Sequence, residues 1–349
     1  MKLGIMMKWA EPQVSVDVRR VQFAERLGYD SVWSAEIYGQ DAITPLAFLA
    51  AQTQHIRLGT GVIQAAARTP AATALAMATV DAMAGGDRVI IGVGLSGPQI
   101  VEGWYGQPWG RPNKRLRDYV TIMRKVLKRE GPVTHDGPEI ALPYEGPGSS
   151  GLGKPLKSVL HTNPDIPIYL GTGNEANVKL TAELADGWLP MGYNPESAKI
   201  FKPWLEEGFA RAGGGKGWDD FKIQCGCQVL ITDDVEAGLA SFKPFLGYYI
   251  GGMGAKDKNF HKMAMEQRGF PEAASRIQEL FLAGRREEAF AAVPDEYVDQ
   301  GALVGPKERI RERFRLWQDL GIDGVTVHGE QTDEILEAMA DIADLKPRA

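Results

Sequence analysis

The feature that most constrains the fold is a joint between a helix and a strand that recurs along the chain. The sequence LGYDSV at residues 27–32 ends a helical pattern and begins an apolar run, and LGIDGV at residues 320–325 repeats it. Looser versions are LADGW at 184–188 and AGGDRV at 84–89. A glycine or small residue ends the helix in a left-handed turn, and the aspartate accepts hydrogen bonds from the turn amides. The joint predicts alternating helices and strands.

From joint to joint, the sequence predicts eight strands separated by helical patterns. Their apolar runs are nearly continuous, as expected for strands covered on both faces. Eight such units indicate an α/β protein with a (β/α)8 TIM barrel. A doubly wound sheet remains an alternative, because alternation alone does not show that a sheet closes. The predicted strands are Leu3–Met7, Ser31–Ala35, Ile56–Val62, Arg88–Leu95, Pro167–Thr172, Gly187–Met191, Phe221–Ile231 and Gly324–His328.

Two segments interrupt this alternation. Tyr144–Pro167 is rich in glycine and proline, and Gly247–Asp299 is far too long for one crossover. Long excursions in compact domains are commonly lids or binding loops, and in a barrel these cluster at the C-terminal face of the strands. We therefore predict a single domain over residues 1–349, with insertions at that face near residues 144–167 and 247–299.

Composition excludes several classes of function. The chain has 349 residues, a formal net charge of −6 and no long run of lysine or arginine, which argues against nucleic-acid binding. It has no apolar stretch long enough to cross a bilayer, and the first apolar run is too short for a signal peptide. Cys225 and Cys227 would share one face of a strand. We expect a cytoplasmic protein with a small-molecule substrate and two reduced cysteines.

The run RVIIGVGLSGP at residues 88–98 contains G-x-G-x-x-G after a predicted strand. A dinucleotide-binding turn needs a helix directly after the third glycine and an acidic residue about 20 positions on. Here Pro98 follows Gly97, the clear helical pattern starts near Pro112, and Asp118 falls inside it. Two interpretations remain: a tight turn, or a strand end whose amides and Ser96 hydroxyl bind an anion. We favour the second.

A second glycine-rich strand end is GTGN at residues 171–174, directly before a helical pattern. Free amides at a helix N-terminus bind phosphate readily, although Thr172 or Asn174 could simply cap the helix. Both interpretations stay open. Two such strand ends in one barrel favour a large anionic cofactor.

Few other residues are candidates for chemistry. Glu36 is a carboxylate at the end of the second predicted strand, where burial would raise its pKa and suit it to proton transfer; a solvated loop position is the alternative. His328 ends the last strand, where a structural role is the simpler interpretation. The five histidines form no H-x-H or H-E-x-x-H set, so we predict no metal site.

Taken together, these motifs resemble the bacterial-luciferase-like flavin and deazaflavin oxidoreductases. Within that family the chain is most similar to the branch that uses the deazaflavin coenzyme F420, the methylenetetrahydromethanopterin-reductase-like proteins. The resemblance rests on segments spread in order over nearly the whole chain: SAEIYGQDAITPLAFLA, RLGTGVIQAAARTPAATA, GVGLSGPQIVEGWYGQPW, YLGTGNEANVKLTAELADGWLP and ALVGPKERIRERF.

The resemblance implies a barrel with the cofactor at its C-terminal mouth. Gly61 and Val62 match the position of a non-prolyl cis peptide that backs the deazaflavin ring in relatives. The segment matched to the cofactor lining is Ser96, Gly97 and Gln99, and the loop matched to the tail phosphate is Gly171, Thr172, Gly173 and Asn174. Glu36 falls where some relatives have a catalytic histidine, which argues against a sugar-phosphate dehydrogenase. Relatives are often dimers, so we expect a homodimer.

The leading hypothesis is a coenzyme F420-dependent oxidoreductase that moves a hydride between the deazaflavin and a small organic substrate. Glu36 would act as acid or base, or only hydrogen-bond the cofactor. Two alternatives remain: an FMN-dependent monooxygenase of the same fold, and a non-catalytic barrel that sequesters the cofactor. Aromatic residues could wall the pocket or simply pack in the core: Trp9, Tyr38, Trp104 and the Tyr248–Met253 stretch.

Overall fold

Eight parallel strands form a closed barrel in the computed structural model, which describes residues 1–8 and 11–348. The last strand pairs with both the first and the seventh, and this closes the ring. The (β/α)8 barrel is therefore confirmed over an open sheet, and every predicted strand is present with bounds within two residues of those expected. In barrel order, the strands are β1 (Lys2–Met6), β2 (Ser31–Ser34), β3 (Arg57–Thr60), β5 (Val89–Gly94), β8 (Ile168–Thr172), β9 (Gly187–Pro190), β10 (Lys222–Ile231) and β12 (Gly324–His328).

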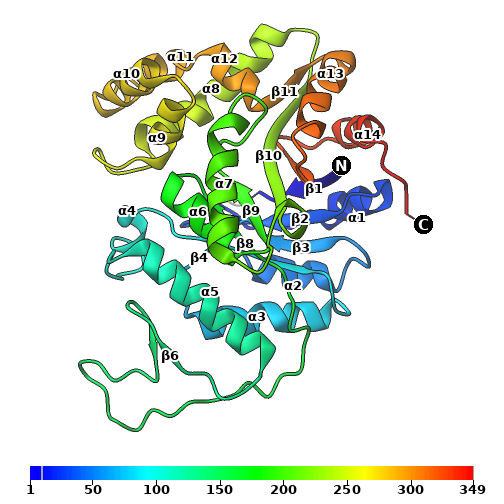
Figure 1. The fold of residues 1–349 in the computed structure, drawn as a ribbon. Helices are drawn as coiled ribbons and strands as arrows, with labels where there is room; N and C mark the ends of the chain where they lie inside the picture. The colour runs from blue at the N-terminus through cyan, green and yellow to red at the C-terminus, as the bar shows by residue number, and fades with distance from the viewer. Residues whose placement is uncertain (9–10, 349) are drawn as a thin grey trace.

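Helices surround the barrel and pack their apolar faces on the strands (Figure 1). The first one shows why the joints work: Asp17 caps its start by accepting a hydrogen bond from the Arg20 amide, and Gly28 ends it with a φ of 93°. The surrounding helices are α1 (Val18–Leu27), α2 (Thr44–Ala50), α3 (Pro70–Met83), α5 (Pro112–Lys128), α6 (Glu175–Leu184), α7 (Ala198–Ala212), α13 (Lys307–Gln318) and α14 (Asp333–Ile342).

The barrel interior is filled by large aromatic side chains. Trp33 on β2 lies 6.2 Å from Tyr169 on β8, measured between ring centroids, and both are buried. Trp33 fits because Gly59 on β3 has no side chain, since a Cβ there would lie 2.4 Å from the indole. This packing closes the barrel below the mouth and gives the site above it a solid floor.

The first long excursion takes a different place from the one predicted. It leaves α5 and returns to β8, so it is a helix-to-strand connection that begins and ends at the N-terminal ends of the strands. It forms a short hairpin, β6 (His135–Asp136) with β7 (Ala141–Leu142), against the outside of α5. Near its end, Asn163 donates a hydrogen bond to Asp87, which precedes β5.

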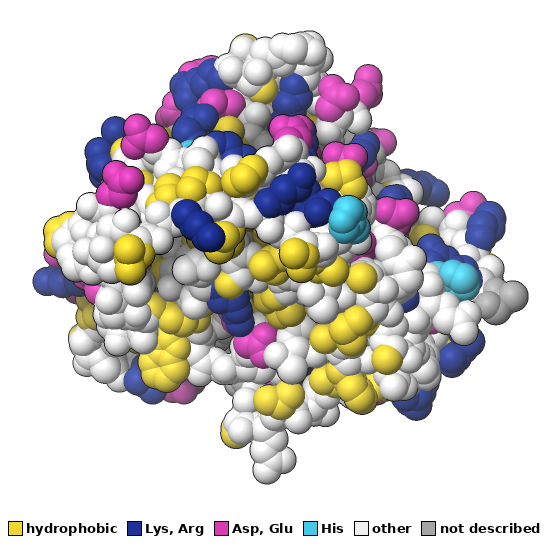
Figure 2. Space-filling view, turned by 90° about the horizontal axis from the view of Figure 1, so that it is seen from below, with side chains coloured by type: hydrophobic (Ala, Val, Ile, Leu, Met, Phe, Trp, Pro, Cys, Tyr) yellow, Lys and Arg dark blue, Asp and Glu magenta, His cyan; other side chains and the backbone are white. Residues whose placement is uncertain are grey.

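Residues 144–167 therefore lie along the outside of the barrel, and the prediction of a lid there is wrong. The segment projects from the body at the lower edge of Figure 1. Figure 2, which views the molecule from that side, shows hydrophobic side chains interspersed with charged ones. The length of an inserted segment alone does not show whether it lies at the N-terminal or the C-terminal ends of the strands.

The second insertion follows β10 and is a helical layer of its own over the C-terminal face (Figure 1). Its helices bury a separate small core that includes Leu239, Met265 and Ile277. It returns through a further parallel strand that pairs with the far half of β10, beyond the barrel, and that the sequence analysis missed. The elements are α8 (Val235–Gly252), α9 (Phe260–Gln267), α10 (Pro271–Leu282), α11 (Arg286–Ala291), α12 (Asp295–Gln300) and β11 (Ala302–Gly305).

Cys225 and Cys227 on β10 are buried and unbridged, as predicted. Burial raises the pKa of the Cys227 thiol to about 12, so it is a core residue rather than a reactive thiol. Within residues 1–8 and 11–348, no cluster of histidine, cysteine, aspartate and glutamate could hold a metal ion. Across the same residues, none of the helices is both long and apolar enough to span a membrane.

Candidate active site

Two adjoining cavities open at the C-terminal ends of the barrel strands. The larger has a volume of about 410 Å³ and lies over Trp33; the smaller, of about 290 Å³, extends outward between β5, β8 and the second insertion. They share part of their walls, so a ligand can occupy both at once. The shared residues are Leu95, Ser96, Gly171, Thr172, Met191, Lys258 and Phe260.

One wall of the larger cavity comes from the end of β3. Gly61 and Val62 are joined by a cis peptide bond, as the family resemblance implies, and both line the cavity. The Val62 side chain fits between two glycines of neighbouring strands. A Cβ on Gly94 would lie 2.6 Å from Val62 Cγ2, and one on Gly171 would lie 2.8 Å from Cγ1. These two glycines therefore leave room for Val62, a role that the glycine motifs did not reveal.

Glu36 lies beside this wall, and its buried carboxylate accepts hydrogen bonds at both oxygens. Arg68 Nη1 donates to both carboxylate oxygens, at 2.7 and 2.8 Å. The amides of Ala42 and Gln64 donate to the same oxygens, at 3.1 and 3.0 Å. Burial alone would lower the pKa of the Arg68 guanidinium, but its hydrogen bond to Glu36 and the carboxylate charge raise it. The pair is thus held as an ion pair that ties β2 to the segment after β3.

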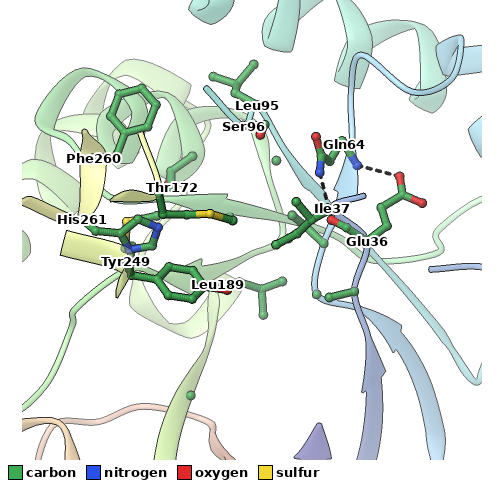
Figure 3. Close-up of a pocket in the computed structure, with 18 of the residues that line it drawn as sticks. Glu36, Ile37, Gln64, Leu95, Ser96, Thr172, Leu189, Tyr249, Phe260 and His261 are labelled. Atoms are coloured by element: carbon green, nitrogen blue, oxygen red, sulfur yellow. Dashed lines mark hydrogen bonds between the residues drawn. The ribbon is translucent and has the colours of Figure 1, made fainter. Parts of the chain in front are cut away.

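Gln64, in the two-residue strand β4 (Ile63–Gln64), lines the cavity. Its Nε2 donates to the Glu36 carbonyl at 3.0 Å, and this fixes which end of the amide is the oxygen. Oε1 is then buried without a hydrogen-bond partner among the described residues. Figure 3 shows Gln64 fastened to Glu36 at the edge of the pocket. A buried acceptor of this kind indicates a ligand that donates a hydrogen bond there.

The end of β5 carries the predicted Ser96, Gly97 and Gln99, and all three line the larger cavity. Ser96 has a φ of 60°, in the left-handed region. A four-residue helix, α4 (Pro98–Val101), opens directly after Gly97, so the prediction that no helix starts before Pro112 is wrong. Gln99 reaches across the mouth, where its Nε2 donates to the Met253 carbonyl at 3.3 Å.

The end of β8 brings Gly171, Thr172, Gly173 and Asn174 to the smaller cavity. The side chains mostly serve the fold: the Thr172 and Thr181 hydroxyls are 2.8 Å apart, and Asn174 caps α6 by accepting from the Asn177 amide at 3.1 Å. The capping interpretation of Asn174 is therefore confirmed. The two amides that precede Asn177 in the first turn have no acceptor within the helix and remain available to an anion.

The opposite wall comes from the second insertion, and the sequence analysis named little of it. Tyr249 and Met253, from the expected Tyr248–Met253 stretch, line the cavity, and so do Phe260 and His261 at the start of α9. Lys258 lies where the two cavities meet, with its ammonium 5.0 Å from the centre of the Trp109 ring. These residues lie on both sides of the irregular loop between α8 and α9, and no spacing in the sequence marks Lys258, Phe260 or His261. The predicted Tyr38 and Trp104 are not in the lining of the larger cavity, and Trp9 lies outside the described residues.

His328 at the end of β12 also faces the larger cavity. Its Nε2 would lie 2.8 Å from a Cβ on Gly226 of β10, so the imidazole occupies the space that this glycine leaves. Burial lowers the pKa of His328 to about 4. The ring is therefore neutral near pH 7 and lies inside the barrel mouth rather than on a solvated loop.

The geometry is that of a ligand site at the mouth of a (β/α)8 barrel, and the sequence places it in a family. The profile of the luciferase-like monooxygenase family matches residues 1–324. The chain belongs to this family. The match covers every strand of the barrel except β12, of which it reaches the first residue, Gly324.

Similar proteins in the family align over most of their length. A Mycobacterium tuberculosis protein named provisionally as a coenzyme F420-dependent oxidoreductase is 44% identical over 342 residues, which cover 97% of this chain and 98% of that protein. The 5,10-methylenetetrahydromethanopterin reductase of Archaeoglobus fulgidus is 27% identical over 87% of this chain and 86% of its own. The solved structure of the F420-dependent tetrahydromethanopterin reductase from Methanopyrus kandleri has a TM-score of 0.78 at 22% identity and covers 99% of both chains.

Proposed function

We propose that the protein is a coenzyme F420-dependent oxidoreductase that transfers a hydride between the deazaflavin ring and a small organic substrate. The observation that carries this proposal is the 44% identity, over nearly the full length, to the mycobacterial protein named for that cofactor. The paired cavities support it, because a ring with an anionic tail needs a compact apolar space joined to a polar one.

The residues present fit such a cofactor. A deazaflavin or flavin ring has an N–H between two carbonyls on its pyrimidine edge, and Gln64 Oε1 is a buried acceptor without a partner. Val62 offers an apolar platform fixed by its two glycine neighbours. The smaller cavity holds the first turn of α6 and the Lys258 ammonium, which suit a phosphate on the tail. FMN shares these features, so the choice of F420 rests on the relatives.

The deazaflavin, when bound, supplies a ring carbon that accepts or donates a hydride. The protein contributes binding, orientation and exclusion of water. Val62 and the floor over Trp33 would support the ring, and Gln64 Oε1 would accept a hydrogen bond from it. The insertion wall covers the mouth. Within this scheme we assign Glu36 to holding the pocket wall, because Arg68 and two backbone amides already occupy its carboxylate.

The variant Glu36→Gln separates this role from proton transfer. If Glu36 holds the pocket wall, the variant should bind the cofactor more weakly, and its kcat at saturating cofactor should be nearly unchanged. An acid or base predicts the reverse: kcat falls about a hundredfold while cofactor affinity stays the same. Cofactor titration and saturating kinetics on the one variant measure both quantities.

The proposed activity is tested by mixing the protein anaerobically with reduced F420 and a panel of electrophiles that carry C=O, C=N or activated C=C bonds. Return of the oxidised cofactor's absorbance in the presence of one class, faster than without protein, supports the proposal. If bound, reduced cofactor is oxidised by no member of the panel, the protein sequesters the cofactor instead. Turnover with reduced FMN and O2 would favour a monooxygenase.

A further inference from the structure

Few charged side chains line the larger cavity. Its charged lining residues within the described part of the chain are Glu36 and Lys258, apart from two histidines. Glu36 is neutralised by Arg68 at 2.7 Å. Lys258 is exposed and lies at the junction with the smaller cavity, beside Trp109. Lys258 is therefore the unpaired charge among the described lining residues, and it lies where the two cavities meet; the rest of the described lining offers a ligand no unpaired charge.

His261 is one of the polar residues that line this space from the insertion, together with Tyr249 and Lys258. Its ring packs edge-to-face on Tyr249, with centroids 4.7 Å apart at 82°. Within the described residues, neither ring nitrogen has a hydrogen-bond partner. Figure 3 shows His261 and Tyr249 across the pocket from Gln64 and Glu36. A ligand that lies against Val62 on one side therefore has the imidazole on its other side.

The imidazole is held in place by the polypeptide around it. Asn259 caps α9 by accepting from the His261 amide at 2.9 Å, and its Nδ2 donates to the carbonyls of Tyr249 and Ile250 at 3.0 and 2.8 Å. One buried side chain thus ties the start of α9 to the end of α8. Burial lowers the pKa of His261 to about 4, so near pH 7 the ring is neutral, with one N–H donor and one acceptor.

Away from Lys258, a charged substrate would lose its hydration in this space and find no opposite charge, which is costly. We propose that the space between Val62 and His261 takes a neutral, mainly apolar substrate with one polar oxygen or nitrogen that hydrogen-bonds to the His261 imidazole. The inference rests on the proposed function for the position of the cofactor against Val62. It specifies the charge class of the substrate and the residue that orients it.

Three probes of the same shape test it: benzamide, which is neutral, benzoate, which is an anion, and benzamidinium, which is a cation. Binding is followed by histidine-selective NMR of the protein, both unloaded and loaded with oxidised F420, with the His261 signal assigned from the His261→Phe variant. We expect benzamide to shift the His261 signal and to bind at least about tenfold more tightly than either ion. Equal or tighter binding of benzoate or benzamidinium would overturn the proposal.

Two variants separate orientation from packing. His261→Phe keeps a ring against Tyr249 but removes both nitrogens, and we expect benzamide affinity to fall severalfold; His261→Asn keeps a donor and an acceptor and should restore part of it. His55→Phe, an exposed position before β3, is the control. If His261→Phe binds benzamide as the parent does, His261 does not orient the ligand.

Failure of the proposed function would be recognised separately. It would appear as an absence of F420 binding in the loading step, whereas the probe comparison on the unloaded protein would still decide the charge class.

Discussion

The two walls of the pocket are built on different principles. The barrel wall, around Val62 and Gln64, interlocks with neighbouring strands, and its charged residue Glu36 is fully engaged. The insertion wall, around Tyr249 and His261, packs on a separate helical core and presents a polar ring without a partner among the described residues. An interlocked wall with the buried unpartnered acceptor Gln64 Oε1 suits the proposed cofactor. A wall that presents the His261 ring suits the proposed substrate.

The largest expected effect near neutral pH is on the ion pair behind the barrel wall. Arg68→Met leaves the buried Glu36 carboxylate without its counter-ion and should lower the free energy of unfolding by about 3 kcal/mol. The Glu36 side chain is only 4% exposed, so water cannot replace Arg68. Chemical denaturation with a circular dichroism readout measures it. Arg19→Met, which breaks the exposed pair with Asp333, should scarcely move the midpoint. Equal effects of the two changes would mean that Glu36 is not buried as described.

The second effect is on the fit of Val62. Gly171→Ala places a methyl group 2.8 Å from Val62 Cγ1, so the platform must shift, and F420 affinity should fall about tenfold. Adding Val62→Ala should recover part of that loss, because the clashing methyl groups are gone. Gly131→Ala, where no atom lies within 4 Å, is the matched control. Additive losses in the double variant would contradict the interlocking.

The third effect is on the pH dependence of stability, to which the buried histidines of the two walls contribute. His261 and His328 have pKa values lowered from 6.5 to about 4 by burial, so between these pH values the unfolded chain binds protons that the folded chain does not. Stability should therefore fall as the pH drops from about 6.5 to about 4 and then level off for these groups. Replacing both with asparagine should remove this loss of stability, which is on the order of several kcal/mol in total over that pH range, as measured by denaturation at a series of pH values. An unchanged slope would show that both rings are charged in the folded protein.

The smallest effect concerns the end of β5. Ser96→Ala removes one hydroxyl from the boundary of the two cavities, and cofactor affinity should fall about threefold, the size of one neutral hydrogen bond. Fluorescence titration is sensitive enough to measure it. An affinity equal to that of the parent would leave only the Ser96 backbone as a contact.

The barrel could be predicted from the sequence because its physics is local and repeated. A glycine of positive φ is present at three of the four joints, as at Gly28, whereas Ala185 ends α6 in an extended conformation. The prediction that the aspartates accept from the turn amides is wrong, because Asp186 and Asp323 accept instead from the Ile168 and Ile223 amides of neighbouring strands. The alternation left closure of the sheet undecided, and the pairing of β12 with both β1 and β10 shows it. The same local reasoning confirmed the cap at Asn174 and the buried cysteines, because each depends only on neighbouring residues.

What the sequence could not show depends on contacts between distant segments. The glycines at 94 and 171 suggested anion binding, whereas their missing side chains accommodate Val62 from a third strand. Glu36 suggested proton transfer, and only the fold reveals Arg68 beside it. His261 had no motif at all, since its position depends on a capping contact from Asn259 in an irregular loop. The prediction put residues 144–167 at the wrong end of the barrel, because that end depends on whether the segment precedes or follows a strand.

The central claim is that the barrel wall and the adjoining anion-binding cavity hold a deazaflavin. The most direct measurement is the absorbance and fluorescence of F420 and of FMN titrated with the purified protein under the same conditions. We predict saturable binding of F420 with a shifted absorbance band, and FMN binding weaker by about tenfold or more. Saturable FMN binding with no response from F420 would contradict the account.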